Sequence, residues 1–325
     1  MPPTVDWKAV RAPLARRARA GVRRVVKTPT SADLPPGRMI TLGDRGATFV
    51  TECGPVDAQP PLVLLHAIGC TAMLSWFSAV PSLAQEHRVV LFDQRWHGRG
   101  PRTGRIFRLN DLADDVIAVA DALGIDRFVP VGYSMGGIVA QLTWQRHRDR
   151  VAGMVLAGTA RNFRGTGRES TFFRMLPPLL LPLAVSGSPH LNARAIHYGI
   201  LGDFAGGTLA DKEFTQWAMN ELRLTSRRAT FSALSAMGAF SSAGWIGEVD
   251  VPTSVVITTK DHCIPTRRQR KLAASIKDAD VFEIDGGHAS CVTHHEEFAA
   301  AVTDACASIV RRIDANGAAP LAAEG

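Results

Sequence analysis

Phe128-Val129-Pro130-Val131-Gly132-Tyr133-Ser134-Met135-Gly136-Gly137 is the stretch that decides the fold of this 325-residue chain. A short β-branched run enters a Gly-x-Ser-x-Gly motif, and an apolar pattern of helical period leaves it. This spacing predicts a sharp strand-to-helix turn that holds Ser134 in a strained backbone conformation. Such a turn lifts the serine hydroxyl out of the sheet and points the first N–H groups of the helix at any anion formed there. We therefore predict that Ser134 is a nucleophile. The alternative is a glycine-rich turn whose serine only caps the helix.

Short apolar segments alternate with helical patterns along most of the chain. This alternation predicts an α/β fold with a mainly parallel central sheet covered by helices on both faces. We expect a hairpin around residues 43–46, and we expect Asn110 to cap one helix and Gly124 to end it. The expected strands are 38–42, 47–52, 62–65, 88–92, 153–157, 253–259 and 281–284, and the expected helices are 73–85, 111–123, 135–147, 266–276 and 294–312.

A nucleophilic serine needs a base within hydrogen-bond reach, and that base needs an acid to hold it. His288 follows the expected strand 281–284 in a glycine-flanked loop, and Asp261 follows the expected strand 253–259. Both stand at the carboxyl ends of strands, where open α/β sheets place their ligand sites. The chain order serine, acid, histidine is the order expected after a nucleophile turn. We predict that Ser134, Asp261 and His288 act together.

Acyl transfer also needs N–H donors for the oxyanion of the tetrahedral intermediate. The amide of Met135, first in the expected helix, is one candidate donor. The amide of Ile68, in the loop after strand 62–65, is the second. His66 opens the same loop, and we expect it to brace the loop by hydrogen bonds rather than to take part in the chemistry.

Several motifs together make the chain resemble α/β-hydrolase fold proteins with a helical cap. The resemblance implies a serine hydrolase of the esterase or lipase kind, with a triad of Ser134, Asp261 and His288, and with Asp93 and His97 as structural residues. Ala67 and Trp96 depart from the family pattern, because family members often have glycine at these positions. The resemblance covers residues 37–313 and rests on His66-Ala67-Ile68-Gly69, Asp93-Gln94-Arg95-Trp96-His97-Gly98-Arg99-Gly100, Gly132-Tyr133-Ser134-Met135-Gly136-Gly137, Lys260-Asp261-His262 and Gly286-Gly287-His288.

The identity of the nucleophile narrows the chemistry that the resemblance implies. Haloalkane dehalogenases and epoxide hydrolases of this fold use an aspartate where this chain has Ser134. We expect an esterase that acts on a lipophilic acyl ester through an acyl-enzyme. One alternative is a C–C bond hydrolase or a cofactor-free perhydrolase acting on a small substrate. Another is a ligand-binding protein built on the hydrolase scaffold.

Changes in composition divide the chain into four expected parts. Residues 160–245 interrupt the strand–helix rhythm with Arg, Gly, Pro and aromatic residues and with helical stretches near 190–201 and 211–224. An insertion of this kind favours a lid over a pocket, and the alternative is an ordinary helical subdomain packed on the sheet. Its apolar residues suggest an acyl pocket formed by Phe172, Phe173, Leu176, Leu179 and Leu180. The expected parts are a basic N-terminal extension and linker at 1–36, a hydrolase core at 37–159 and 246–313, a helical cap at 160–245 and a disordered tail at 314–325.

The formal charge of +7 is concentrated at the N-terminus, because residues 1–27 hold eight basic residues and one acidic residue. The rest of the chain is neutral overall, which argues against a nucleic-acid-binding body. Residues 13–27 form an amphipathic helical pattern that predicts a peripheral contact with an anionic membrane or an acidic partner. The alternative is a solvated helix or a frayed tail. We expect no signal peptide and no transmembrane helix.

The five cysteines are odd in number, widely spaced and without a Cys-x-x-Cys motif. This usage favours a reducing compartment, so we expect a cytoplasmic protein, with peripheral membrane contact if residues 13–27 bind lipid. The spacing of His262, Cys263, His288 and Cys291 matches no familiar zinc pattern, so we expect no metal and no cofactor. The oligomeric state is left open by the sequence.

Overall fold

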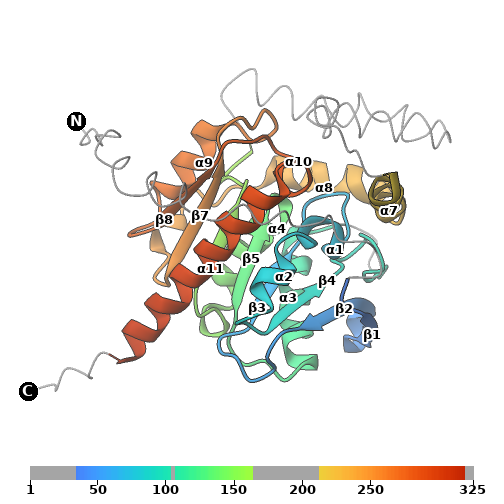
Figure 1. The fold of residues 1–325 in the computed structure, drawn as a ribbon, viewed down its shortest axis with the longest axis horizontal. Coiled ribbons are helices and arrows are strands. Elements are labelled where there is room, and N and C mark those ends of the chain that lie inside the picture. The colour runs from blue at the N-terminus through green and yellow to red at the C-terminus, as the bar shows by residue number, and fades with distance from the viewer. Residues whose placement is uncertain (1–33, 104–106, 164–211, 319–325) are drawn as a thin grey trace, which may run out of the picture.

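The computed structural model of the protein describes residues 34–103, 107–163 and 212–318 (Figure 1). The basic segment 13–27, the helical stretch near 190–201 and the apolar residues expected to form an acyl pocket lie outside the described residues. The membrane contact, the domain boundaries and the lid therefore stay predictions. No helix in the described part of the chain is long and apolar enough to cross a membrane.

An eight-stranded sheet forms the centre of the molecule, with the order β1-β2-β4-β3-β5-β6-β7-β8. The first hairpin and the β2–β4 pair are antiparallel, and all later neighbours are parallel. The α/β fold with a mainly parallel sheet is thereby confirmed. The strands are β1 Gly37–Thr41, β2 Ala47–Cys53, β3 Leu62–Leu65, β4 Val89–Phe92, β5 Val129–Tyr133, β6 Met154–Ala157, β7 Thr253–Thr258 and β8 Asp280–Ile284.

Helices cover both faces of the sheet, and α11 runs diagonally across the strands in Figure 1. Alternate residues of β3 point to opposite faces, because side chains of a strand alternate. Val63 and Leu65 belong to a core cluster with α3, α4 and α9, whereas Leu62 and Leu64 belong to a second cluster with α1, α2 and α11. The helices are α1 Ala72–Trp76, α2 Val80–Leu83, α3 Leu109–Ala122, α4 Met135–Arg146, α7 Lys212–Arg223, α8 Arg227–Ala239, α9 Thr266–Ala273, α10 Ser290–Thr293 and α11 His295–Ala318.

Two expectations about the first helices are wrong. The single helix expected at 73–85 is two short helices, α1 and α2. Pro81 stands in the first turn of α2, where its missing N–H is tolerated, but it could not continue a helix that began at α1. Asn110 is not a cap, because α3 begins at Leu109 and the cap position is Arg108. Gly124 does follow the end of this helix, with a φ of 65°.

Two other helices differ from expectation. α11 continues to Ala318, so residues 314–318 are helical rather than disordered, and 319–325 lie outside the described residues. Ala315 and Ala318 favour this extension, whereas Asn316 and Gly317 are poor helix formers, so helix propensity does not explain it. α8 was not expected at all. Its cap is Ser226, whose hydroxyl accepts a hydrogen bond from the amide of Ala229 at 3.2 Å.

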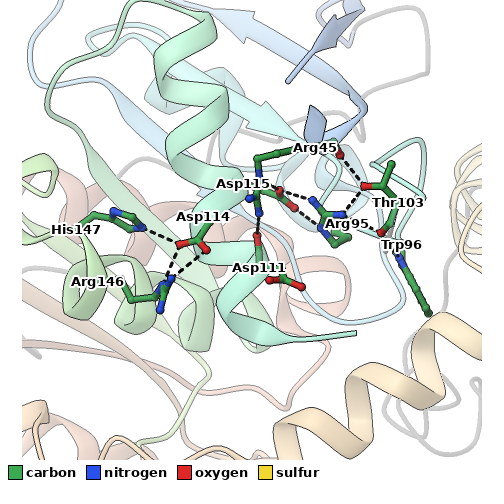
Figure 2. A network of polar contacts seen from close by, with 9 residues as sticks. All are labelled: Arg45, Arg95, Trp96, Thr103, Asp111, Asp114, Asp115, Arg146 and His147. Carbon is green, nitrogen blue, oxygen red and sulfur yellow. Dashed lines mark hydrogen bonds and ion pairs between the residues drawn. The ribbon is translucent and has the colours of Figure 1, made fainter. Parts of the chain in front are cut away.

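A polar network ties the first hairpin to α3 and to the loop after β4 (Figure 2). Asp115 of α3 is 1 % exposed and accepts hydrogen bonds from Arg45 Nε at 2.6 Å and from Arg95 Nη2 at 2.6 Å and Nε at 2.8 Å. Arg95 also donates to the backbone carbonyl and the hydroxyl of Thr103. The network therefore fixes the conformation of the loop that follows β4.

Candidate active site

Ser134 occupies a strained turn between β5 and α4. Its φ of 56° and ψ of −114° lie where residues with side chains are rarely found. The amide of Ser134 donates to the carbonyl of Ala157 at the end of β6, which ties the turn to the neighbouring strand. A Cβ on Gly132 would lie 2.3 Å from the carbonyl oxygen of Gly136. The glycine is required because the strand and the first helical turn come so close together.

The structure joins the three predicted residues in one buried chain of hydrogen bonds. His288 Nδ1 lies 2.7 Å from Asp261 Oδ2, and His288 Nε2 lies 2.9 Å from Ser134 Oγ. An ionised carboxylate can only accept, so the imidazole proton is on Nδ1. The Nε2 lone pair is then free to accept the hydroxyl proton of Ser134. This arrangement can activate the serine as a nucleophile.

Asp261 is held as an ionised carboxylate. Its Oδ1 accepts from the amides of Cys263 at 2.9 Å and Ile264 at 2.7 Å, and its Oδ2 accepts from the Thr258 hydroxyl at 2.8 Å. Burial raises the pKa of the Asp261 carboxyl, but the interaction and hydrogen bond with His288 and the hydrogen bonds from Ile264 and Thr258 lower it by more, so the net shift is downward. Asp261 can therefore stabilise a protonated His288.

Two neighbours of these residues were not singled out from the sequence. Gln269 of α9 is buried and donates from Nε2 to Asp261 Oδ2 at 3.0 Å. Gln269 lies on the same face of α9 as Leu272 and Ala273, and this spacing could have predicted that its side chain is buried. The ring of Tyr133 stacks on His288 with centroids 5.6 Å apart, and its hydroxyl donates to the His288 carbonyl. Gln269 therefore limits the movement of the Asp261 carboxylate, and Tyr133 limits the movement of the His288 imidazole.

The loop after β3 lies beside the Ser134 turn, because Leu65 pairs with Gly132 in parallel register. His66 is fully buried: its Nε2 accepts from the amide of Gln94 at 2.9 Å, and its Nδ1 donates to the carbonyl of Ala67 at 2.8 Å. These bonds agree with the expected bracing role. The loop's positive φ is at Gly69, so Ala67 replaces a glycine without strain.

The motif after β4 is buried against the same loop. Asp93 accepts from the amides of Ala72 and Arg99, each at 2.8 Å, and His97 is fully buried, as expected for structural residues. Burial raises the pKa of Asp93, and the bonds from those amides and the charge of Arg99 oppose the rise. Trp96 has a φ of 67°, which explains why glycine suits this position.

The residues proposed as oxyanion donors belong to an apolar core cluster. Ile68 and Met135 belong to the same buried cluster as Ala233 and Met237 of α8. Phe214 of α7 belongs to the second cluster, together with Tyr133. Among the residues that the structure describes, no group of three or more His, Cys, Asp or Glu side chains could hold a metal ion.

Gly136→Ala is expected to lower the free energy of unfolding by about 3 kcal/mol. The new Cβ would lie 2.0 Å from the carbonyl oxygen of Leu65, a backbone atom of β3 that cannot move without disturbing the sheet. Gly238→Ala in α8 is the matched control, because no atom lies within 4 Å of its added Cβ. It should raise helix stability by up to about 1 kcal/mol. Urea unfolding measures both, and a Gly136→Ala protein as stable as wild type would contradict the prediction.

Acid is expected to destabilise the fold through His66. Burial lowers its pKa to about 4, and the hydrogen bond to Ala67 opposes only part of this shift. The unfolded chain takes up this proton near the ordinary value of ~6.5, so between these pH values the unfolded state binds more protons. The stability present at neutral pH is therefore lost as the pH falls, by at most about 1.4 kcal/mol per pH unit for this group. His97, with a pKa lowered to about 3 by burial, acts in the same direction.

Urea unfolding between pH 7 and 4.5 measures this slope. His66→Gln should give a shallower slope than wild type. His262→Gln, at an exposed histidine, should leave the slope unchanged. Equal slopes for His66→Gln and wild type would show that His66 does not carry the acid sensitivity.

The sequence model of the family described as alpha/beta hydrolase fold matches residues 60–295. A putative carbamate hydrolase, RutD, from Agrobacterium fabrum is 25% identical over 75% of this chain and 92% of its own length. A poly(3-hydroxyalkanoate) depolymerase from Ectopseudomonas oleovorans is 26% identical over 74% of this chain and 81% of its own length. Epoxide hydrolase B from Mycobacterium tuberculosis is 38% identical, but over only 35% of this chain and 32% of its own length.

A solved structure shares the fold at low sequence identity. A hydrolase from Pseudomonas aeruginosa superposes with a TM-score of 0.68 and 22% identity, covering 83% of this chain and 98% of that one. At this identity the likeness concerns the fold alone.

Proposed function

Since this chain belongs to the alpha/beta hydrolase fold family, we propose that it is a serine hydrolase that cleaves carboxylic esters with a lipophilic acyl group. The observation that carries the proposal is the hydrogen-bonded chain from Ser134 through His288 to Asp261, at the positive-φ turn after β5. This arrangement meets the requirements of acyl transfer by a serine nucleophile.

The geometry supports a two-step reaction. Ser134 Oγ attacks the carbonyl carbon while its proton passes to His288 Nε2, and Asp261 stabilises the resulting imidazolium. The histidine then gives this proton to the leaving alcohol, and the acyl group remains on Ser134. Water attacks the acyl-enzyme with the same histidine as base, which releases the acid and restores the serine.

The oxyanion of each tetrahedral intermediate is assigned to the amides of Ile68 and Met135. Met135 is the first residue of α4, so its N–H has no partner within the helix. Ile68 belongs to the adjoining loop after β3, whose strand pairs with β5. One such donor contributes roughly 3 kcal/mol to stabilising the transition state.

A serine nucleophile favours acyl substrates over epoxides. Attack by Ser134 on an epoxide carbon would leave an ether, which water does not cleave, whereas an acyl-serine is hydrolysed readily. The partial match to an epoxide hydrolase therefore does not support epoxide hydrolysis by this chain. The similarity to a poly(3-hydroxyalkanoate) depolymerase and the apolar cluster that contains Ile68 and Met135 support a lipophilic acyl group.

The test is hydrolysis of p-nitrophenyl esters from acetate to palmitate, with a p-nitrophenyl N-alkyl carbamate beside them. We expect turnover of esters with an optimum at medium or long acyl chains, and slower turnover of the carbamate. A faster carbamate than any ester would point to the chemistry named for RutD.

Absence of turnover at every chain length would overturn the esterase proposal. A diketone substrate and a peroxide assay then test C–C bond hydrolysis and perhydrolysis by the same residues. A ligand retained without turnover would favour the binding-protein alternative.

A further inference from the structure

A buried carboxylate of α7 contacts the loop that carries Ile68. Glu221 is 7 % exposed, although it stands on a helix with several solvent-exposed residues. Its Oε2 accepts the hydroxyl proton of Thr71 at 2.5 Å, and its Oε1 accepts from Arg99 Nη2 at 3.0 Å. A carboxylate is costly to bury, so both of its oxygens need such partners.

Thr71 links this carboxylate to the start of α1. It is the N-cap residue of α1, and its Oγ1 accepts from the amide of Leu74 at 3.3 Å while it donates to Glu221. Thr71 is also three residues after Ile68, at the far end of the loop that begins with His66. Glu221 therefore holds the end of this loop that is opposite to the end held by His66.

Arg99 connects Glu221 to a second carboxylate. Its Nη1 lies 3.6 Å from Asp93 Oδ2, and Asp93 Oδ1 accepts from the amide of Ala72, the residue after Thr71. Arg99 also stacks over the Phe49 ring at 4.8 Å from its centroid. The guanidinium thus lies between two carboxylates that both contact the junction of the loop and α1.

The turn between α7 and α8 binds the loop after β4 as well. The Gly98 amide donates to Thr225 Oγ1 at 3.0 Å, and Arg102 Nη2 donates to the carbonyl of Leu224 at 3.1 Å. Thr230 of α8 lies close to Gly69, since its Oγ1 is 3.9 Å from the position of an added Cβ there. The α7–α8 pair therefore contacts the Ile68 loop at two points. Glu221 of α7 accepts from Thr71, and Thr230 of α8 lies close to Gly69.

We propose that Glu221 is a positioning residue, which sets the orientation of the Ile68 amide through Thr71 and makes the oxyanion site depend on the docking of α7 and α8. This inference rests on the proposed function, because it assigns Ile68 as an oxyanion donor. An amide that is held less firmly stabilises the transition state less, whereas binding of the ground-state ester changes little.

Glu221→Ala is expected to lower kcat for the best p-nitrophenyl ester about tenfold, with KM within about twofold of wild type. This is smaller than the loss of roughly 10²–10³ from removing an oxyanion donor outright, because the Ile68 amide remains present but is less well placed. Glu221→Gln keeps the chain length and an oxygen that can accept from Thr71, so it should recover most of kcat. Glu248→Ala is the control and should match wild type, since Glu248 forms an exposed ion pair with Arg148, just after the C-terminal end of α4, whereas the loop lies beside the Ser134 turn at its N-terminal end.

Amide hydrogen exchange gives a readout that does not depend on the substrate. Glu221→Ala should speed exchange in residues 67–72 and leave exchange in residues 135–146 unchanged. If Glu221→Ala does not fold, the same comparison is made with Thr71→Val and with Thr71→Ser, which retains the hydroxyl and should behave as wild type.

Unchanged exchange in residues 67–72, or a change in KM alone, would overturn the positioning role. A wild-type protein that hydrolyses no ester would instead overturn the proposed function. In that case hydrogen exchange alone decides whether Glu221 orders the loop.

Discussion

Ser134→Ala is expected to lower kcat for ester hydrolysis by about 10⁶-fold, the loss observed when a triad serine is removed from a comparable hydrolase. The physical reason is that Ser134 supplies the atom that forms the acyl-enzyme. His288 Nε2 lies 2.9 Å from Ser134 Oγ, and among the described residues it has no other hydroxyl partner that could replace the serine. Steady-state hydrolysis of the best p-nitrophenyl ester measures the effect. The fold should be retained, since alanine removes one oxygen from Ser134 and adds no atom to its buried site.

The control is Ser82→Ala, at an exposed serine of α2, which should match wild type. A double variant of Ser134→Ala and His288→Ala should be little slower than Ser134→Ala alone, because residues that act as a unit are not additive. A kcat within tenfold of wild type for Ser134→Ala would exclude this serine as the nucleophile.

Asp115→Ala is expected to lower the free energy of unfolding by about 3–5 kcal/mol. Asp115 is buried between Arg45 and Arg95, and both arginines lie within 2.6 Å of its Oδ1 (Figure 2). Removing the carboxylate leaves Arg95, whose side chain is 7% exposed, as a buried charge without this partner. The large cost arises from that uncompensated charge rather than from the attraction of the pair itself.

Asp114→Ala is a matched control at the adjacent position of the same helix. Asp114 contacts Arg146 and His147 at 2.9 Å, but these side chains are between 25% and 37% exposed (Figure 2). Water screens a pair of this kind, so its loss should cost about 1 kcal/mol or less. Urea unfolding compares the two variants. Equal destabilisation by both would contradict the argument that burial makes Asp115 the more costly loss.

Local patterns were enough to predict most of the sheet. The strand at 62–65 has its predicted bounds because four consecutive apolar residues are buried on both faces of a parallel sheet. The Ser134 turn was predictable from its motif, because Gly132 is needed where the strand meets the first helical turn. Gly136 is needed for another reason, since a Cβ there would meet the carbonyl of Leu65 in β3. Ser134, Asp261 and His288 each follow an expected strand, which predicted that all three lie at the carboxyl edge of the sheet. The structure brings them together there.

Helix boundaries were less predictable. The interruption at Pro81 has a local cause, because proline cannot continue a helix, but the apolar pattern over residues 73–85 does not record it. The start of α3 at Leu109 lies one residue before the expected cap Asn110. The helix α8 shows no strong apolar period, and its buried residues are mostly alanines, so its place in the buried cluster that contains Ile68 and Met135 was not visible in the sequence.

The sequence by itself determined the class of fold and the serine turn, and it indicated the candidate residues for the proposed acyl transfer, because each of these was recognised in a short motif. Only the tertiary structure decided which contacts place those residues. Gln269 reaches Asp261 from a separate helix, and Glu221 reaches Thr71 across 150 residues. Such contacts arise when helices pack on a sheet, and the buried polar groups brought together there must satisfy one another, a requirement that no local pattern records.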